Sequence, residues 1–271
     1  MQEGQFVNTE DKDLFLHIDG VSELMDEYCR FLDEKEGGSK HTVLFYGDTG
    51  CGKGFFSNEC IRKVKEKNSE VVVIDLLDNF RASNFGSEKK LNGVLEIIEY
   101  DLIAHGAFDE LKGKNAKPEM FKWILEKQLK EKKMLLLIRF PQIEVYDEIE
   151  KYCEYLDNDN TIIYFISERK AIVDACRKKY EKEIKYFELE RLKQGDGKLI
   201  IDNIFSKEEF PQFDVNDLES LMSKRPINNK MTIRELLRVC NYAYAYAKEN
   251  KIKYITSTII AEAIFAKSSM I

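Results

Sequence analysis

One stretch of eight residues constrains the fold of this chain more than any other: the run GDTGCGKG at 47–54. It follows a short apolar run at 42–46 and precedes a stretch from about 55 to 67 with helical character. The pattern G-x-x-x-x-G-K between a strand and a helix is typical of a loop that wraps phosphate groups. We therefore expect strand, loop and helix in this order.

The residue types in this run suit phosphate binding. Glycines let successive backbone N–H groups turn inward around phosphate oxygens, and the following helix adds its positive N-terminus. Lys53 is placed to reach the terminal phosphates as a point charge. The residues expected to hold the phosphates are Gly47, Asp48, Thr49, Gly50, Cys51, Gly52, Lys53 and Gly54.

The position after the lysine departs from the usual pattern. A Ser or Thr there normally supplies a hydroxyl ligand to Mg²⁺, whereas this chain has Gly54. Ser57 lies about one helical turn further along, too far to replace that hydroxyl. Binding of Mg²⁺ is therefore doubtful.

The rest of the N-terminal two thirds alternates between two patterns. Uninterrupted apolar runs, typical of parallel strands buried on both faces, lie at 71–77, 134–140, 161–167 and 184–189. Stretches with helical periodicity lie at 13–34, 91–104, 119–132, 147–156 and 170–183. Strands that alternate with helices predict right-handed βαβ units and one parallel sheet.

After Leu192 the pattern changes. A GDG sequence at 195–197 breaks the chain, and the remainder is helical in character. We expect two domains in this α/β protein, a nucleotide-binding sheet core at 1–193 and a helical lid at 194–271. Together they account for all 271 residues.

Composition excludes several classes of protein. The chain has 42 Lys and Arg against 49 Asp and Glu, a net charge of −7, which disfavours nucleic acid as the sole partner. Its apolar runs are shorter than the roughly 20 residues of a membrane span. The polar, acidic N-terminal stretch lacks a signal-peptide pattern, which predicts a cytoplasmic protein. The six cysteines form no C-x-x-C pair, so we expect reduced thiols and no metal site.

The apolar run at 134–140, the third along the chain after those at 42–46 and 71–77, lacks the acids that phosphate-loop enzymes need. In those enzymes this strand ends in Asp, which holds Mg²⁺. Here Arg139 and Phe140 stand at that end. Arg139 has two open roles, a fixed cation near the phosphates or a salt bridge at the strand end. The weak stand-ins for the missing acids are Asp75, Asp78, Glu144 and Asp147.

Together these segments resemble the AAA+ ATPases, and most of all the central domain of bacterial enhancer-binding transcription activators. The matching segments, in order, are GDTGCGKG at 47–54, NFGSEK at 84–89, TIIYFISER at 161–169, YFELERL at 186–192 and RPINNKMTIRELLRV at 225–239. The resemblance implies that Arg234 senses the γ-phosphate from the lid. It also implies ring or filament oligomers with nucleotide at subunit interfaces. In that family a missing hydroxyl after the lysine does not by itself abolish activity.

The departures from the family are informative as well. LNGVLEI at 91–97 stands where the activators carry their sigma-factor loop, and Glu168 replaces the sensor-1 asparagine. Arg177, with Lys178 and Lys179 beside it, lies in the region of the arginine fingers. No DNA-binding helix-turn-helix follows the lid segment in this sequence. A degenerate relative that keeps the phosphate loop fits better than a working activator.

We therefore expect a protein that binds ATP or ADP with impaired hydrolysis and acts as a nucleotide-controlled assembly or regulatory subunit. Its expected partners are copies of itself, or an AAA+-type assembly, and another protein. Two alternatives stay open. One is an active ATPase with relocated carboxylates or carboxylates supplied by a neighbouring subunit. The other is a scaffold that binds no nucleotide.

Overall fold

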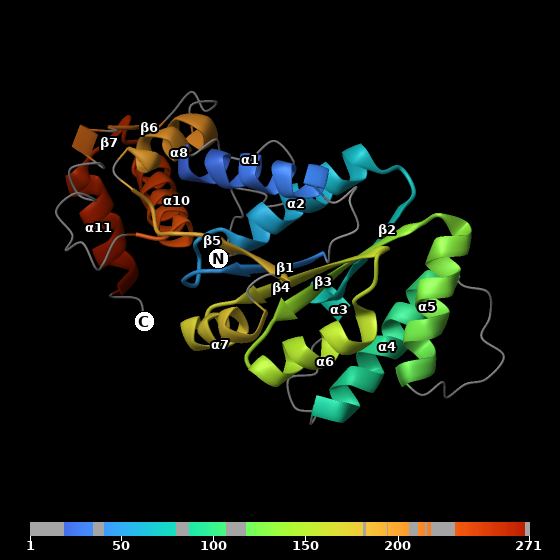
Figure 1. Cartoon of the computed structure of the whole chain (residues 1–271). Helices are drawn as coiled ribbons and strands as arrows, with labels where there is room; N and C mark the ends of the chain where they lie inside the picture. The colour runs from blue at the N-terminus through green and yellow to red at the C-terminus, as the bar shows by residue number, and fades with distance from the viewer. Residues whose placement is uncertain are drawn as a thin grey trace. The chain divides into compact units, whose positions relative to one another are not determined.

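The computed structural model describes residues 19–34, 41–79, 87–106, 118–180, 183–193, 195–205, 211–214, 216–217 and 231–268. The chain forms two compact units (Figure 1). Unit 1 consists of residues 1–24, 48–56 and 189–271, and unit 2 of residues 25–47 and 57–188. The segment 48–56, which carries most of the glycine-rich loop, thus belongs to the same unit as the C-terminal helices.

Unit 2 is built on a five-stranded parallel sheet. The strands are β1 (Thr42–Tyr46), β2 (Val71–Asp75), β3 (Leu135–Gln142), β4 (Thr161–Ser167) and β5 (Ile184–Glu188). Their order in the sheet is β2-β3-β4-β1-β5, and every neighbouring pair is parallel. The predicted parallel sheet of an α/β protein is confirmed.

Two of the predicted strand ends were wrong by two residues, and a third by one, because β5 ends at Glu188 rather than at residue 189. β2 stops at Asp75 rather than at residue 77, because the Asp75 carboxylate accepts a hydrogen bond from the Leu77 backbone N–H at 3.1 Å and α3 (Leu76–Asn79) begins there. β3 runs two residues further than predicted, to Gln142, although Pro141 cannot donate a backbone hydrogen bond. The register with β4 shifts between Arg139 and Gln142, so the proline lies in an irregular part of the ladder.

Alternate residues of the sheet face two layers of helices. The helices along this part of the chain are α1 (Asp19–Glu34), α2 (Lys53–Lys67), α4 (Ser87–Ala104), α5 (Pro118–Lys132), α6 (Tyr146–Leu156) and α7 (Lys170–Tyr180). α4, α5 and α6 lie together on one face of the sheet (Figure 1). Their core includes Leu44 and Phe165, both fully buried. On the other face, the Tyr28 ring of α1 packs edge-on against the rings of Tyr164 and Phe187.

The described residues of the C-terminal part of unit 1 form three helices and a small sheet. The helices are α8 (Asp196–Phe205), α10 (Ile233–Glu249) and α11 (Ser257–Ser268). The expectation that everything beyond Leu192 is helical was incomplete, because β6 (Gln212–Phe213) and β7 (Tyr254–Ile255) pair in parallel. The core of this part is formed by buried residues that include Leu192, Ile200, Leu236, Cys240, Tyr244, Ile255 and Ile260.

Two further expectations concern single residues and segments. All six cysteines are free, as predicted. Among the helices built from described residues, none has the length and apolar character needed to cross a membrane.

Candidate functional site

The glycine-rich loop has a backbone that only glycines accept easily. Gly47, Gly50 and Gly52 have φ angles of 142°, 86° and 90°, in the region that side chains disfavour. Cys51 N–H donates to the Asp48 carbonyl at 3.2 Å, and Phe56 N–H donates to the Gly52 carbonyl at 2.9 Å as α2 begins. Glycines with positive φ that turn the backbone directly before a helix N-terminus are typical of an anion-binding loop. The expected strand, loop and helix are all present.

Lys53 folds back over this loop. Its ammonium Nζ donates to the Asp48 carbonyl oxygen at 2.8 Å, which places the positive charge against the loop backbone. Within the loop, burial raises the pKa of the Cys51 thiol, and the nearby Asp48 carboxylate raises it further. Cys51 is therefore a neutral packing residue of the loop at physiological pH, and Lys53 is its cation.

The Asp48 side chain is bound by a residue that the sequence did not single out. Arg191 follows β5, and its Nε donates to Asp48 Oδ2 at 2.6 Å. This bond to Asp48 is the largest cause that raises the pKa of the Arg191 guanidinium, and Glu235 adds to it. The one signal available in the sequence was the acid itself, since a carboxylate in a phosphate-binding loop needs a compensating cation.

The first turn of α10 packs on the same loop. Thr232 caps the helix, and its hydroxyl and the Glu235 carboxylate form a reciprocal capping box. The Arg234 backbone N–H donates to the Gly50 carbonyl at 3.1 Å. A Cβ on Gly50 would lie 2.7 Å from Arg234 Cβ, so only glycine allows this approach. The Arg234 side chain is exposed and forms no ion pair with a described residue.

Arg139, at the end of β3, is held inside unit 2. Its Nε donates to Asp75 Oδ1 at 3.1 Å, and its Nη2 forms an ion pair with Asp75 Oδ2. Its Nη1 donates to Ser57 Oγ at 3.0 Å and to the side-chain oxygen of Asn58. Of the two roles left open by the sequence, the salt bridge at the strand end is the one present here.

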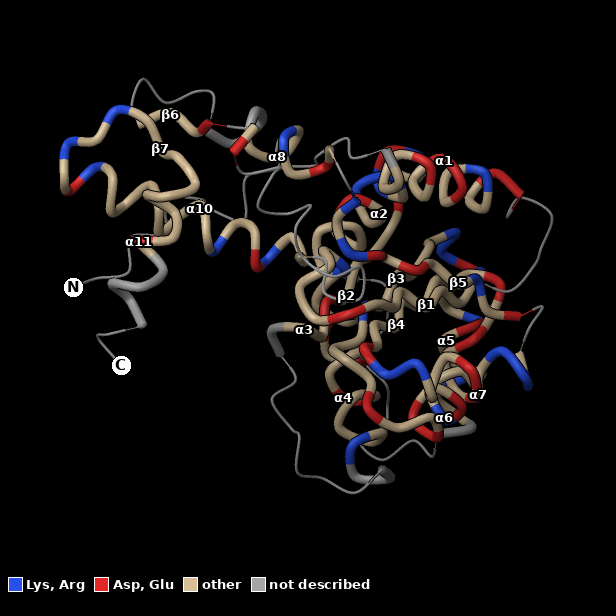
Figure 2. Tube along the Cα trace, turned by 90° about the vertical axis from the view of Figure 1, so that its left-hand side faces the viewer, with Lys and Arg blue, Asp and Glu red and all other residues tan. Residues whose placement is uncertain are grey.

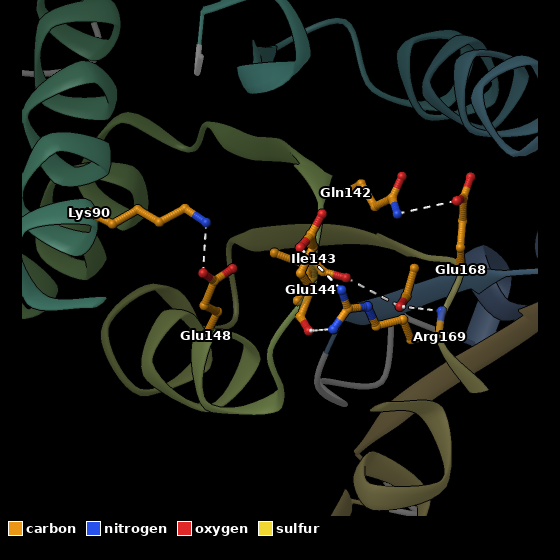
Figure 3. A network of polar contacts seen from close by, with 8 residues as sticks. Lys90, Gln142, Ile143, Glu144, Glu148, Glu168 and Arg169 are labelled. Atoms are coloured by element: carbon orange, nitrogen blue, oxygen red, sulfur yellow. Dashed lines mark hydrogen bonds and ion pairs between the residues drawn. The ribbon is translucent and has the colours of Figure 1, made fainter. Parts of the chain in front are cut away.

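Of the other stand-in acids, Glu144 lies in a polar network at the ends of β3 and β4 (Figure 3). Gln142 donates to the Glu168 carboxylate at 3.3 Å, and the Arg169 guanidinium contacts Glu144 at the same distance. Asp147 lies in the first turn of α6. The side chain of Asp78, residues 84–86 and residues 225–230 lie outside the described residues. Among the described residues no group of three metal-ligating side chains occurs.

Arg177, expected near an arginine-finger position, is stacked within its own unit. Its guanidinium lies 5.3 Å from the centre of the Tyr46 ring and 5.2 Å from that of Tyr186. It also donates to the Tyr46 hydroxyl at 2.6 Å, and that hydroxyl donates to Glu188 at 2.8 Å. Burial, aided by the Glu188 carboxylate, raises the pKa of Tyr46 to about 12.

Comparison with known proteins identifies the fold. No family model and no curated protein matches the chain. Solved structures do match: ORC from Drosophila bound to DNA (TM-score 0.60, 13% identity), Aeropyrum pernix ORC1 in complex with DNA (0.62, 12%) and the Thermotoga maritima RuvB Holliday junction branch migration motor (0.54, 15%). They cover 95%, 96% and 97% of this chain. The chain has the AAA+ fold.

The AAA+ likeness extends over only part of the matched proteins. The chain spans 66%, 68% and 73% of the lengths of the three structures, in the order given. At 12–15% identity the likeness establishes the fold alone. The closer likeness to enhancer-binding activators stays a prediction.

Two groups that the AAA+ fold implies can be tested against the residues present. The loop fits nucleotide phosphates, because its left-handed glycines, the N-terminus of α2 and Lys53 supply the required cradle and charge. Two positions differ from the usual Mg²⁺ ligands of P-loop enzymes. Gly54 supplies no hydroxyl, and Arg139 replaces the acid at the end of β3.

Proposed function

We propose that this chain binds ATP or ADP through residues 47–54, hydrolyses it poorly, and acts as a nucleotide-controlled assembly or regulatory subunit. The observation that carries the proposal is the backbone of the loop. Its glycines at 47, 50 and 52 adopt positive φ angles directly before α2, and Lys53 lies against the loop. A chance glycine-rich turn has no need of all these features together.

The residues around β3 support the proposal of impaired hydrolysis. In P-loop enzymes Mg²⁺ neutralises the charge that develops on the transferred phosphoryl group, and an acid of this strand holds the ion. Arg139 occupies that position and is paired with Asp75. Loss of one positioned catalytic group costs about 10²–10³ in rate, and here both a hydroxyl and an acid are replaced. Binding that does not depend on Mg²⁺ is the result that we expect.

Regulation through α10 is supported by its contact with the loop. Because Arg234 N–H binds the Gly50 carbonyl, a change of loop conformation on phosphate binding acts directly on the first turn of α10. The exposed Arg234 side chain is the proposed sensor of the γ-phosphate. A shift in this helix would then alter which surfaces are presented for assembly.

The proposed partners are copies of this chain, or an AAA+-type assembly, and another protein in the cytoplasm. The charged residues of α1 and α6 are mostly acidic (Figure 2), and such surfaces repel the phosphates of nucleic acids. The basic end of α7, with Arg177, is the proposed contact to a neighbouring subunit.

Thermal unfolding with ATP or ADP, in Mg²⁺ or in EDTA, tests the proposal. Ligand at a hundred times its Kd stabilises a protein by about 2.7 kcal/mol, a shift of a few degrees. We expect equal shifts in Mg²⁺ and EDTA, lost in Lys53→Ala and kept in Lys65→Ala, which changes an exposed lysine of the same helix. If neither nucleotide changes the unfolding temperature, the scaffold that binds no nucleotide is the remaining alternative. ATP turnover that requires Mg²⁺ and Lys53 supports the active enzyme instead.

A further inference from the structure

The phosphate-binding loop carries an acid of its own, which poses an electrostatic problem. The Asp48 side chain is more than half exposed, and its backbone carbonyl accepts hydrogen bonds from both Cys51 N–H and Lys53 Nζ. A nucleoside triphosphate adds about four negative charges to such a site. A carboxylate carried by the loop repels such a ligand, and the repulsion grows with the number of phosphates.

Arg191 lies in a position to remove that repulsion. Its Nε and Asp48 Oδ2 are 2.6 Å apart, and its side chain is one-third exposed. A second acid that acts on Arg191 electrostatically is Glu235, which the capping box of α10 holds in place. Arg191 is thus bonded to the acid of the loop and attracted at longer range by the acid of the helix that packs on Gly50.

We propose that Arg191 is a positioning residue of the nucleotide site, which neutralises Asp48 and fixes its carboxylate so that the loop accepts a polyphosphate. This inference rests on the proposed function, because it concerns the same loop. It adds a residue that lies 143 positions from Asp48 in the chain and that no phosphate-loop motif contains.

If Arg191 served only the folding of the chain, its removal would lower the unfolding temperature without ligand. Exposed ion pairs contribute little to folding stability, so we expect the unfolding temperature of Arg191→Ala without ligand to be nearly that of the wild type. The effect of Arg191 is expected in nucleotide affinity alone. It is also expected to be larger for ATP than for ADP, since the repelled charge is larger.

The test is titration of the full chain with a fluorescent ATP analogue and the matching ADP analogue at low ionic strength. Arg191→Ala is expected to weaken ATP binding about tenfold and ADP binding less, by removal of one neutralising charge near the phosphates. Asp48→Asn alone keeps wild-type affinity or improves it. The double variant Asp48→Asn/Arg191→Ala is expected to bind within about threefold of Asp48→Asn, because no carboxylate is left to neutralise. Lys193→Ala is the control, since Lys193 is a cation on the same segment that pairs with Glu190.

The outcomes that would overturn the inference are as follows. Wild-type affinity in Arg191→Ala overturns the inference. Weak binding that Asp48→Asn fails to rescue also overturns it, because Arg191 then contacts the phosphates directly. If the wild-type chain binds neither analogue, or binds them equally well in Lys53→Ala, the proposed function itself is wrong and this inference fails with it. Wild-type binding that depends on Lys53 but not on Arg191 leaves the proposed function standing.

Discussion

Arg139 and Asp75 occupy paired positions on neighbouring parallel strands, and their side chains form a two-point ion pair. The Arg139 side chain is 7% exposed and the Asp75 side chain 33%. The end of β3 thus carries a cation whose charge is neutralised by Asp75, at the position where P-loop enzymes have an acid. Ser57 and Asn58, one turn into α2 from Lys53, accept hydrogen bonds from Arg139 Nη1.

Arg139→Met is expected to destabilise the protein by about 2–3 kcal/mol. Removal of one partner from a buried ion pair leaves the other charge uncompensated, and the partial exposure of Asp75 reduces the usual penalty of about 3–5 kcal/mol. Urea unfolding of the purified variant measures the loss.

A second pair of variants controls this prediction. Asp75→Asn, which leaves Arg139 buried without its counter-ion, is expected to destabilise by a similar amount. The double variant should lose less than the sum of the two single losses, because the partners act as one unit. Additive losses would show that the two side chains act independently.

The pairing of Arg139 with Asp75 could not be predicted from the sequence, whereas the elements around it could. The apolar runs of β1, β3 and β4 and the glycine pattern of the loop are local signals, so strands, loop and parallel sheet were predictable. Whether Arg139 faces a phosphate or an acid depends on the register of β3 against β2, which no local pattern contains. The end of β2 was missed for a related reason: Leu76 and Leu77 are as apolar as the strand before them, although they begin α3.

The long-range contacts of the site could not be predicted from the sequence either, because no local pattern contains them. Asp48 was visible as an acid in the loop, but its partner Arg191 comes from the segment after β5. The close packing of Arg234 on Gly50 likewise depends on a contact between segments more than 180 residues apart in the sequence.

Gly54→Ser restores the hydroxyl that P-loop enzymes place after the lysine. No atom lies within 4 Å of a Cβ built on Gly54, so the side chain fits without rearrangement. We expect stability within about 0.5 kcal/mol of wild type or slightly higher, because glycine is a poor helix former. We also expect the shift in unfolding temperature caused by ATP to become larger with Mg²⁺ than with EDTA.

Gly54→Ala is the matched control for the hydroxyl. It gains the same helix propensity without a metal ligand, so its ATP-induced shift should not respond to Mg²⁺. Equal responses of the serine and alanine variants would mean that position 54 does not reach the ion.

Gly50→Ala tests the contact between the loop and α10. The substitution combines a φ of 86° with a Cβ only 2.7 Å from Arg234 Cβ, so both strain and a clash arise. We expect a loss of roughly 2–4 kcal/mol and no ATP-induced thermal shift.

Gly106→Ala separates the two causes. Gly106 has a φ of 67°, but a Cβ there meets no atom of the described residues within 4 Å, so this variant carries the backbone strain without the clash, about 1 kcal/mol. If Gly50→Ala costs no more than Gly106→Ala, the approach of Arg234 to Gly50 contributes nothing.

Because the pKa of Tyr46 is raised in the folded protein, we expect the stability of the fold to decrease at alkaline pH. Burial, with Glu188 as the next cause, raises the pKa of Tyr46 from 10 to about 12 in the folded protein. Below pH 10 the phenol is neutral in both the folded and the unfolded state, so its contribution is constant. Between pH 10 and about 12 the unfolded state loses the proton first, which favours unfolding, and stability falls as the pH rises.

Tyr46→Phe removes this titration, along with the hydrogen bonds to Glu188 and from Arg177. The variant should be less stable than wild type at pH 8, by about 1–3 kcal/mol, because two hydrogen bonds of about 0.5–1.5 kcal/mol each are lost. Its stability should then fall less steeply from pH 10 to 12, so the two curves converge as the pH rises. Buried Tyr28 and Tyr164, whose pKa values are also raised, titrate equally in both proteins and cancel from the comparison. Parallel curves measured by urea unfolding across this range would show that Tyr46 ionises no later in the folded chain than in the unfolded one.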